Sequence, residues 1–424
     1  MFAVVLANMT SQSRSALLFS IATIACAGNP IASSPSATTS PKPSASAQLP
    51  PGSSAVSNAA TDAQPGLPGP TFYVINETEY KLSLLRIGSA IVATIGPIFS
   101  KLSDAGIEQD ELFGKGLPGI LQAPVTALAG RFPDAMWATV LQNNGSSGWG
   151  ELYRQGKHGW SRVGRALPQT VFHIGMGNWS DGRVLALQGS PMGMGAPFAF
   201  RIVSGLAPVP ILTKPSAWPG GDADDECKHW RTLLAPEKLV VLTSGHVFVV
   251  GRTCTLDAYG VEHWAPGQTK SQVYIFPESN EWWDVKLLAH SERALVMFVN
   301  TRKQSLFAHF DGTVWTTEPL DIEGTVTDAE LAIDGTLFAV SQAFRHSPPG
   351  SPPEELPGRL FWRPMGQAKF SEIAVPSRNI PEGWPAAFAG VTAVAASSKD
   401  DVWVVSGDLL FHSRPAPDGP RKIE

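Results

Sequence analysis

The sequence has little charge, few cysteines and few tyrosines. Of its 424 residues only 16% are charged, and 32 Lys and Arg residues against 37 Asp and Glu residues give a net charge of −5. Such a balance provides no basic surface for nucleic acid and no acidic tail, so partners recruited by bulk charge are not expected. No long stretch shows the 3.6-residue period of an amphipathic helix, which argues against a helical domain.

Recognisable catalytic motifs are also missing. The G-x-S-x-G sequence that places a nucleophilic serine on a sharp turn does not occur. Sialidase-like propellers use an arginine cluster, a tyrosine and a carboxylate. With five tyrosines and no intact Asp-box, the sequence offers no residues that can be matched to that catalytic set. The histidines are scattered along the chain, so we expect no metal site and no cofactor. The sequence therefore favours binding over catalysis.

A short apolar segment near the N-terminus ends in a cysteine. Residues 15–25 read SALLFSIATIA and are followed by Cys26. This run is too short to span a bilayer and has the form of a removable signal peptide. The tetrad TIAC at 23–26 resembles the lipobox of bacterial lipoproteins, which implies an acylated cysteine as the mature N-terminus. An ordinary secretory signal cut beside the cysteine is the alternative, and translation could start at Met1 or at Met9.

Residues 27–70 are rich in Ser, Pro and Ala. They include almost no aromatic or charged side chains, so this segment cannot bury enough apolar surface to fold. Pro-rich chains favour polyproline II at about 3.1 Å per residue, so roughly forty residues would reach on the order of 120 Å when stretched. We therefore interpret the chain as a signal peptide with a lipobox at 1–26, a disordered linker at 27–70 and a folded domain at 71–424.

The folded domain repeats one short pattern. A polar or Gly-containing turn precedes a run of apolar residues, which is followed by a loop and a second apolar and aromatic run. The clearest copy is the last, KDDVWVVSGDLLFH at residues 399–412. Earlier copies begin near residues 80, 134, 180, 244, 291 and 334. A unit of this kind cannot cover both faces of its own sheet, so the copies must stack on one another.

Stacked antiparallel units of about 40 to 60 residues are typical of the blades of a β-propeller. We predict an all-β fold, a propeller of about seven four-stranded blades. Residues 71–75 form a spare strand, and the last copy, 402–412, lacks one, so pairing the two would close the ring. A pair of β-sandwiches is the competing architecture, but it would not explain the repeated order of turns and strands.

The pattern over residues 71–424 resembles the secreted bacterial propellers with WD40-like, YVTN-like or Asp-box-like repeats. Residues 311–315, DGTVW, have the Gly and Trp of an Asp-box at the right separation, but Phe310 stands where the defining Asp belongs. Trp283-Asp284 is a lone WD dipeptide. The resemblance implies a shape and no particular chemistry.

Two cysteines remain in the folded domain, Cys227 and Cys254. In an exported protein a disulfide between them is expected, and closing this loop is worth about 3 kcal/mol in the chain-entropy estimate. A metal site around Cys227 and His229 is the alternative, which the lack of a second His at ligand spacing disfavours. The acidic run 222–226 lacks the glycine and the closing Glu of a calcium loop, so we expect a solvated loop there.

Seven of the thirteen tryptophans fall into two groups. Those inside apolar runs are expected to pack between blades; they are Trp137, Trp315, Trp362 and Trp403. Those in expected loops could present a ring to a carbohydrate or a protein; these candidate ligand contacts are Trp282, Trp283 and Trp384.

These features together predict a monomeric, envelope-anchored or secreted binding or assembly module. Its partners would be a membrane, through the N-terminal lipid, and an envelope protein or a carbohydrate. The alternatives are a hydrolase or lyase acting on polysaccharide or small lactones, and a structural component of the envelope. An enzyme would bring polar side chains from several blades together at one mouth of the central channel.

Overall fold

The chain divides into two units, Met1–Ala63 and Gln64–Glu424, and the computed structural model describes residues of the second. The described residues are 69–77, 82–87, 90–95, 98–103, 106–108, 125–131, 135–143, 148–156, 159–163, 172–178, 183–189, 199–202, 207–208, 234–253, 258–268, 271–276, 279–345, 354–376 and 390–414. The predicted signal peptide, Cys26 and nearly all of the predicted linker lie outside them.

The described strands form seven four-stranded antiparallel sheets. The first four, in chain order, are β2 (Ser83–Ile87), β3 (Ala90–Ile95), β4 (Ile98–Ser103) and β5 (Gly106–Glu108); β6 (Val125–Arg131), β7 (Ala135–Asn143), β8 (Gly148–Gly156) and β9 (Gly159–Arg162); β10 (Phe172–Asn178), β11 (Val184–Gly189), β12 (Ala199–Ile202) and β13 (Ala207–Pro208); and β14 (Leu234–Val241), β15 (Val247–Thr253), β16 (Tyr259–Trp264) and β17 (Gln272–Phe276).

The other three sheets follow in the same way, and the last of them takes its fourth strand from the start of the domain. They are β18 (Trp282–Ser291), β19 (Ala294–Thr301), β20 (Ser305–Phe310) and β21 (Trp315–Pro319); β22 (Thr325–Leu331), β23 (Leu337–Gln342), β26 (Arg359–Arg363) and β27 (Ser371–Ile373); and β28 (Val391–Ser398), β29 (Asp401–Ser406), β30 (Leu409–His412) and β1 (Tyr73–Glu77). A short pair, β24 (Phe344–Arg345) and β25 (Glu354–Glu355), extends the sixth sheet's connection. One 3₁₀ turn, η4 (Ser279–Glu281), is the only helix in these ranges, and it is far too short to cross a membrane.

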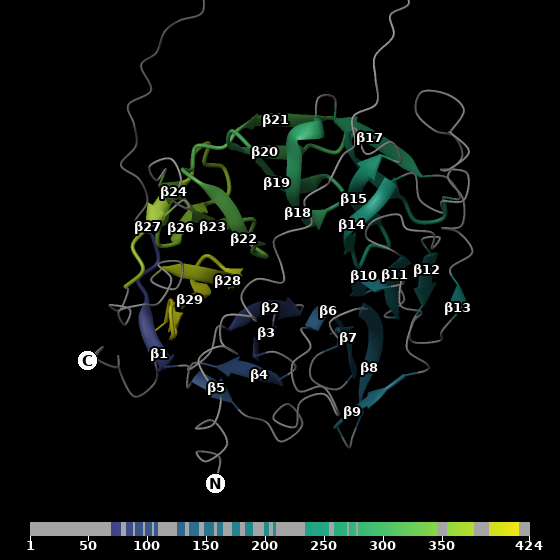
Figure 1. Ribbon diagram of the computed structural model, residues 1–424, viewed down its shortest axis with the longest axis horizontal. Coiled ribbons are helices and arrows are strands. Elements are labelled where there is room, and N and C mark those ends of the chain that lie inside the picture. Colours follow the sequence, from purple (N-terminus) through teal and green to yellow (C-terminus); the bar gives the residue numbers. More distant parts are fainter. Residues whose placement is uncertain are drawn as a thin grey trace, which may run out of the picture. The chain divides into compact units, whose positions relative to one another are not determined.

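The sheets follow one another around a ring, so the domain is a β-propeller and the sheets are its blades (Figure 1). The innermost strand of each blade contacts that of the next, in the order β2, β6, β10, β14, β18, β22, β28 and back to β2. The predicted all-β propeller is confirmed, and the alternative of two β-sandwiches is wrong. Side chains between neighbouring blades form the core; one cluster joins Phe248 and Tyr259 to Leu287 and Met297 of the next blade.

The ring closes through the N-terminal strand. β1 pairs antiparallel with β30, with Tyr73 opposite His412 and Glu77 opposite Leu409. Ile75 and Phe72 are buried against the last blade and its neighbours. This confirms the prediction that the spare strand near residue 73 completes the last blade, an arrangement that leaves no free outer edge on β30.

The repeat seen in the sequence corresponds to one structural register. In each blade, one residue of the first apolar run lies in the second strand and faces a residue of the second run in the third strand. The pairs are Val92–Lys101, Trp137–Arg154, Leu185–Ile202, Phe248–His263, Val296–His309, Phe338–Trp362 and Trp403–His412. Several pairs stack, with ring centres 4.3 Å apart for Phe248 and His263 and 4.0 Å apart for Trp403 and His412. Cross-strand ring contacts of this kind are a unit of sheet stabilisation.

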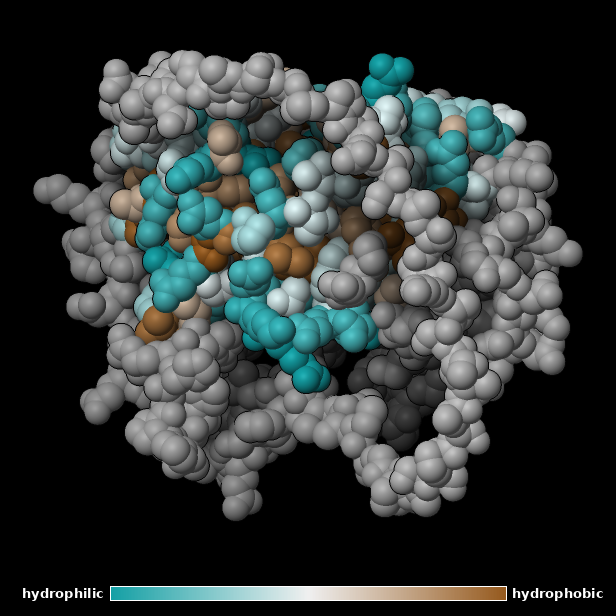
Figure 2. Space-filling view, turned by 90° about the horizontal axis from the view of Figure 1, so that it is seen from above, coloured by the Kyte–Doolittle hydropathy of each residue, from teal (hydrophilic) through white to brown (hydrophobic). Residues whose placement is uncertain are grey.

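The outer edge of blade β18–β21 is polar. In β21, at the top of Figure 1, the four residues 316–319 are exposed. Figure 2, which views the molecule from above, shows a described surface that is mainly hydrophilic, with hydrophobic residues visible between the hydrophilic ones. Polar residues and a proline on an edge strand disfavour pairing with other chains.

Candidate functional site

Two kinds of connection leave each blade at opposite ends. The turns that join its first to its second strand, and its third to its fourth, share one end because the strands are antiparallel; we call this the hairpin end. In the blades β18–β21 and β22–β27 the hairpin end comprises residues 292–293, 311–314, 332–336 and 364–370. The connections to the next blade leave from the other end.

An ion pair links two non-adjacent blades at the innermost strands. Arg86 of β2 donates from Nε to Oε1 of Glu330 in β22 at 2.9 Å, and from Nη2 to the backbone carbonyl of Leu331 at 3.0 Å. β28 lies between β2 and β22 in the ring, so this contact bridges a blade. Burial raises the pKa of Glu330 to about 7, although Arg86 acts to lower it.

Polar groups from a third blade join this arrangement. Asp328 of β22 accepts a hydrogen bond at Oδ2 from the backbone N–H of Val394 in β28 at 3.0 Å. Its other oxygen accepts from the backbone N–H of Ala329 at 3.0 Å. The polar groups of the inner strands are thus bonded to one another across blades. This arrangement is expected to stabilise the ring, and it leaves these groups poorly placed to react with a substrate.

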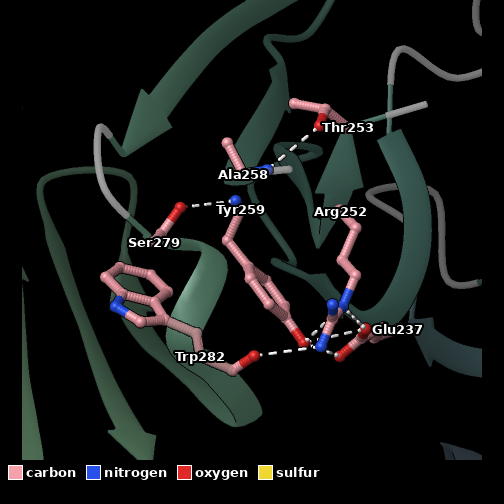
Figure 3. Close-up of polar contacts among 7 residues, drawn as sticks. All are labelled: Glu237, Arg252, Thr253, Ala258, Tyr259, Ser279 and Trp282. Atoms are coloured by element: carbon pink, nitrogen blue, oxygen red, sulfur yellow. Dashed lines mark hydrogen bonds and ion pairs between the residues drawn. The ribbon is translucent and has the colours of Figure 1, made fainter. Parts of the chain in front are cut away.

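Glu237, Arg252 and Tyr259 of blade β14–β17 form a second polar cluster (Figure 3). The phenol of Tyr259 donates to Glu237 Oε1 and Oε2 at 3.0 and 3.1 Å, and Arg252 Nη2 donates to the backbone carbonyl of Trp282 in the next blade at 2.9 Å. Burial raises the pKa of Tyr259, so the phenol keeps its proton at neutral pH. Burial also raises the pKa of Glu237, although its bonds to Tyr259 and Arg252 act to lower it. The cluster joins two blades through groups that satisfy one another.

A third group places a carboxylate between a serine and a histidine. Ser397 Oγ donates to Asp401, and His412 Nε2 lies 2.9 Å from the other oxygen of Asp401. The bond from His412 lowers the pKa of Asp401 to about 2. A serine nucleophile needs the histidine beside its hydroxyl, with the acid behind the histidine. Here the acid lies in the middle, so the order of groups is wrong for that chemistry.

Two histidines stack at the hairpin end of blade β14–β17. His246 Nδ1 and His263 Nε2 lie 2.8 Å apart, with ring centres separated by 5.1 Å. Burial lowers the pKa of His263 to about 4, and the neighbouring His246 lowers it further, so His263 is neutral at pH 7. Within the part of the chain that the structure describes, no three His, Cys, Asp or Glu side chains are grouped to hold a metal ion.

A cavity of about 570 Å³ lies between blades β18–β21 and β22–β27 at the hairpin end. Its apolar lining includes Leu295, Val296, Phe310, Leu331 and Leu337. Two exposed apolar side chains also line it, Ile333 and Met365, which are 50% and 78% exposed. Cavities of about 300–1,000 Å³ with mainly apolar walls and a few polar groups are typical of small-molecule sites.

One edge of the cavity is held by the following blade. The backbone N–H of Lys399 donates to Asp334 Oδ2 at 2.7 Å, and the backbone N–H of Ile333 donates to the carbonyl of Ser397 at 3.0 Å. Asp334 Oδ1 also accepts from the backbone N–H of Thr336 at 3.0 Å. The turn that carries Ile333 is therefore fixed in place by its neighbours.

The polar side chains of the cavity come from seven different strands or turns. They are His290, Arg293, His309, Glu318, Asp334, Arg363 and Gln367. The guanidinium carbon of Arg363 lies 4.1 Å from the ring centre of Phe307 and 5.0 Å from that of Phe370. Burial lowers the pKa of Arg363, and the charge of Glu318 opposes that change. Among the described residues the side chain of Arg363 forms no ion pair within 4.0 Å and no hydrogen bond.

The tryptophans predicted to contact a ligand differ in their exposure. Trp283 is 53% exposed, but Trp282 is 5% exposed and packs against Tyr259 and Phe276, so the expectation of a surface position for Trp282 is wrong. The two residues begin β18 rather than lying in a loop, and successive side chains of a strand point to opposite faces. Trp384 lies outside the described residues, as do Cys227 and Cys254, whose disulfide stays a prediction.

The tryptophans assigned to the core follow the prediction more closely. Trp137, Trp362 and Trp403 are buried, and Trp315 is partly buried against Phe276 and Phe310.

Sequence reasoning missed the cavity because its residues are dispersed. His290 and Arg363 are far apart in the chain and belong to different repeats. One signal was available: Arg363 follows the apolar run 360–362 directly, and an arginine at the end of a buried strand needs a partner or a stacking surface.

No protein-family model and no curated protein matches the sequence. Among solved structures, the fold is similar to that of a hydrazine synthase chain from Kuenenia stuttgartiensis, with 10% identity, a TM-score of 0.50, and coverage of 84% of this chain and 99% of that one. YCF48 bound to a D1 peptide gives 10% identity and a TM-score of 0.49 over 82% of this chain and 99% of that one.

A third similar structure belongs to a longer protein. It is the extracellular domain of the one-component system BT4673 from B. thetaiotaomicron, at 11% identity and a TM-score of 0.49 over 81% of this chain. The present chain spans only 40% of that chain's length. At 10% identity, the comparison with the hydrazine synthase chain shows a shared fold and nothing of ligand or activity.

Proposed function

We propose that this chain is an extracytoplasmic binding module whose ligand occupies the cavity between blades β18–β21 and β22–β27. The cavity is the observation that carries the proposal, since it combines apolar walls, a fixed edge and an arginine that forms no ion pair or hydrogen bond with the described residues. Groups that meet at the inner strands, such as Arg86 and Glu330, are bonded to each other instead. The seven sheets would serve as blades of a rigid frame for this site.

The proposal also includes how the module is displayed. Cys26 would carry a lipid anchor, and residues 27–70 would act as a flexible tether that holds the monomeric propeller away from the membrane. The supporting observations are the TIAC tetrad at 23–26 and the Ser, Pro and Ala composition of the linker. An envelope protein or a carbohydrate remains the wider class of partner, with Trp283 as its exposed aromatic contact.

Filling the cavity tests the binding proposal. Ala294 lines the cavity, so Ala294→Trp should occupy it, while Lys303→Trp in an exposed turn at the other end of the same blade serves as the matched control. The measurement is the shift in melting temperature caused by a panel of amino-acid derivatives, sugars, cell-wall fragments and organic acids. A ligand of the module should stabilise the natural protein and the control but not Ala294→Trp.

Two results would contradict the binding proposal. One is that no compound in the panel shifts the melting temperature. The other is that the same compounds shift all three proteins equally, which would place binding elsewhere.

A further inference from the structure

We infer that the cavity binds a compact organic carboxylate with an apolar side group, and that Arg363 pairs with its carboxylate. This inference rests on the proposed binding function and specifies the ligand's chemical class. The bound carboxylate would lie at the guanidinium of Arg363, and the apolar group would face Val296, Ile333 and Met365.

Arg363 has hydrogen-bond donors that the described residues do not use. A half-buried guanidinium that forms no ion pair or hydrogen bond with the described residues is costly unless another partner compensates for lost water. The rings of Phe307 and Phe370 supply part of that compensation through cation–π contact. Ring contact does not use the N–H groups of the guanidinium fork, which match the two oxygens of a carboxylate.

The charge around the cavity also favours an anion over a cation. Arg293 is a second cation of the lining. Of the two acids, Asp334 already accepts hydrogen bonds from the backbone N–H groups of Thr336 and Lys399. Glu318 lies on the exposed strand β21, where water screens its charge. An ammonium ligand would thus find only exposed carboxylates, whereas a carboxylate ligand finds a half-buried arginine.

The size and apolar lining of the cavity define the rest of the ligand. A volume of about 570 Å³ suits a molecule of the size of an acylated amino acid. Ile333 and Met365 are large apolar side chains left exposed at the same site, which is unusual unless something covers them. An apolar group of the ligand that packs against Ile333 and Met365 would remove their exposed surface from water.

The experiment compares two ligands of nearly the same size and shape, one with a carboxylate and one with a neutral amide in its place. N-acetyl-leucine and N-acetyl-leucinamide are titrated into the purified protein by calorimetry at pH 7. A charge-assisted bond to a partly buried arginine should make the acid bind about 10- to 100-fold more tightly than the amide. In Arg363→Met, which keeps an unbranched apolar stem, the acid should weaken to the level of the amide, while the amide's affinity should be unchanged.

Two further variants make the result specific. Arg302→Met changes an exposed arginine in the turn at the other end of blade β18–β21 and should leave both affinities as they are. Arg363→Lys keeps the positive charge without the planar fork and should retain a preference for the acid several-fold smaller than that of the natural protein. This variant provides the test if Arg363→Met proves unfolded in a thermal melt.

Several outcomes would overturn the inference. Equal binding of acid and amide to the natural protein, or an acid preference that survives both Arg363 variants, would show that Arg363 does not recognise the charge. Failure of both compounds to bind at millimolar concentration would also overturn it. The proposed binding function has a separate test, because other ligands lost only in Ala294→Trp would sustain it even then.

Discussion

At the residue scale, folding strongly changes the pKa of the Glu330 carboxyl. It lies beside Arg86 and Asp328 among the inner strands, and burial raises its pKa from 4.5 to about 7. A carboxyl with a raised pKa holds its proton more tightly in the folded state than in the unfolded state. The folded state therefore binds more protons between these two pH values, and stability falls as the pH rises through this window.

Replacing Glu330 with Gln should remove this pH dependence. A shift from 4.5 to about 7 corresponds to up to about 3 kcal/mol of unfolding free energy lost between pH 4.5 and pH 7. Urea unfolding of the natural protein and of Glu330→Gln across this range gives the difference directly. Glu372→Gln, which changes an exposed acid, is the control and should run parallel to the natural protein. Parallel curves for Glu330→Gln as well would contradict the assignment.

The two adjacent tryptophans show what sequence alone could resolve at this scale. The polar run at 277–281 favours a loop that includes Trp282 and Trp283, but these two residues begin β18. The register against β19 shifts between Trp282 and Asp284, so Trp283 is the extra residue of a bulge and projects outward while Trp282 packs inward. Bulges have no clear sequence signal, which is why one of the two positions was wrong.

At the scale of elements, the blades approach most closely where side chains are absent. Gly175 and Gly177 of β10 face β14, and a Cβ atom built on Gly177 would lie 2.5 Å from Cβ of Val241. Between β6 and β10, the side-chain amide of Asn178 accepts from the backbone N–H of Gly130 at 2.7 Å and donates to its carbonyl at 3.0 Å. These contacts set the spacing of three neighbouring inner strands.

The substitution Gly177→Ala should therefore destabilise the ring. The added methyl group would overlap Val241 and force the two inner strands apart, at an expected cost of about 1–3 kcal/mol. Gly156→Ala in β8 is the matched control, because the nearest atom to its added Cβ lies at 3.9 Å. Chemical denaturation measures both changes, and equal stability of the two variants would show that β10 and β14 can separate without cost.

The strand pattern was predictable at this scale because it depends on local alternation. The same position of each repeat, such as Phe248, Phe338 and Trp403, points to the blade interface in the structure as the repeat suggested. Contacts between distant repeats were not predictable. Arg86 and Glu330 are 244 positions apart, and neither belongs to a motif.

At the scale of the whole molecule, the two ends of the domain are joined in one sheet. β1 supplies the fourth strand beside β30, and Phe72 and Ile75 are buried there. This long-range pairing was predictable from the sequence, because the first repeat has a strand to spare and the last lacks one. We therefore expect β1 to be required for the stability of the last blade.

Two truncations test this closure. A chain that begins at residue 69 keeps β1 and should melt at the same temperature as a chain that begins at residue 27. A chain that begins at residue 82 loses Phe72, Val74 and Ile75 and exposes the edge of β30, so it should melt at least about 5 °C lower and aggregate. Calorimetric melting and gel filtration provide the readouts. Identical behaviour of the chains that begin at 69 and 82 would contradict closure by β1.

The central claim is that this propeller works as a binding module displayed outside the cytoplasm. Its most direct test is the intact mass and membrane fractionation of the protein expressed in a Gram-negative host, beside a Cys26→Ser variant. The account predicts that the natural protein is cut before Cys26, gains the mass of acyl chains and sediments with membranes, while the variant does neither. Two soluble forms cut at the same place would contradict the anchor.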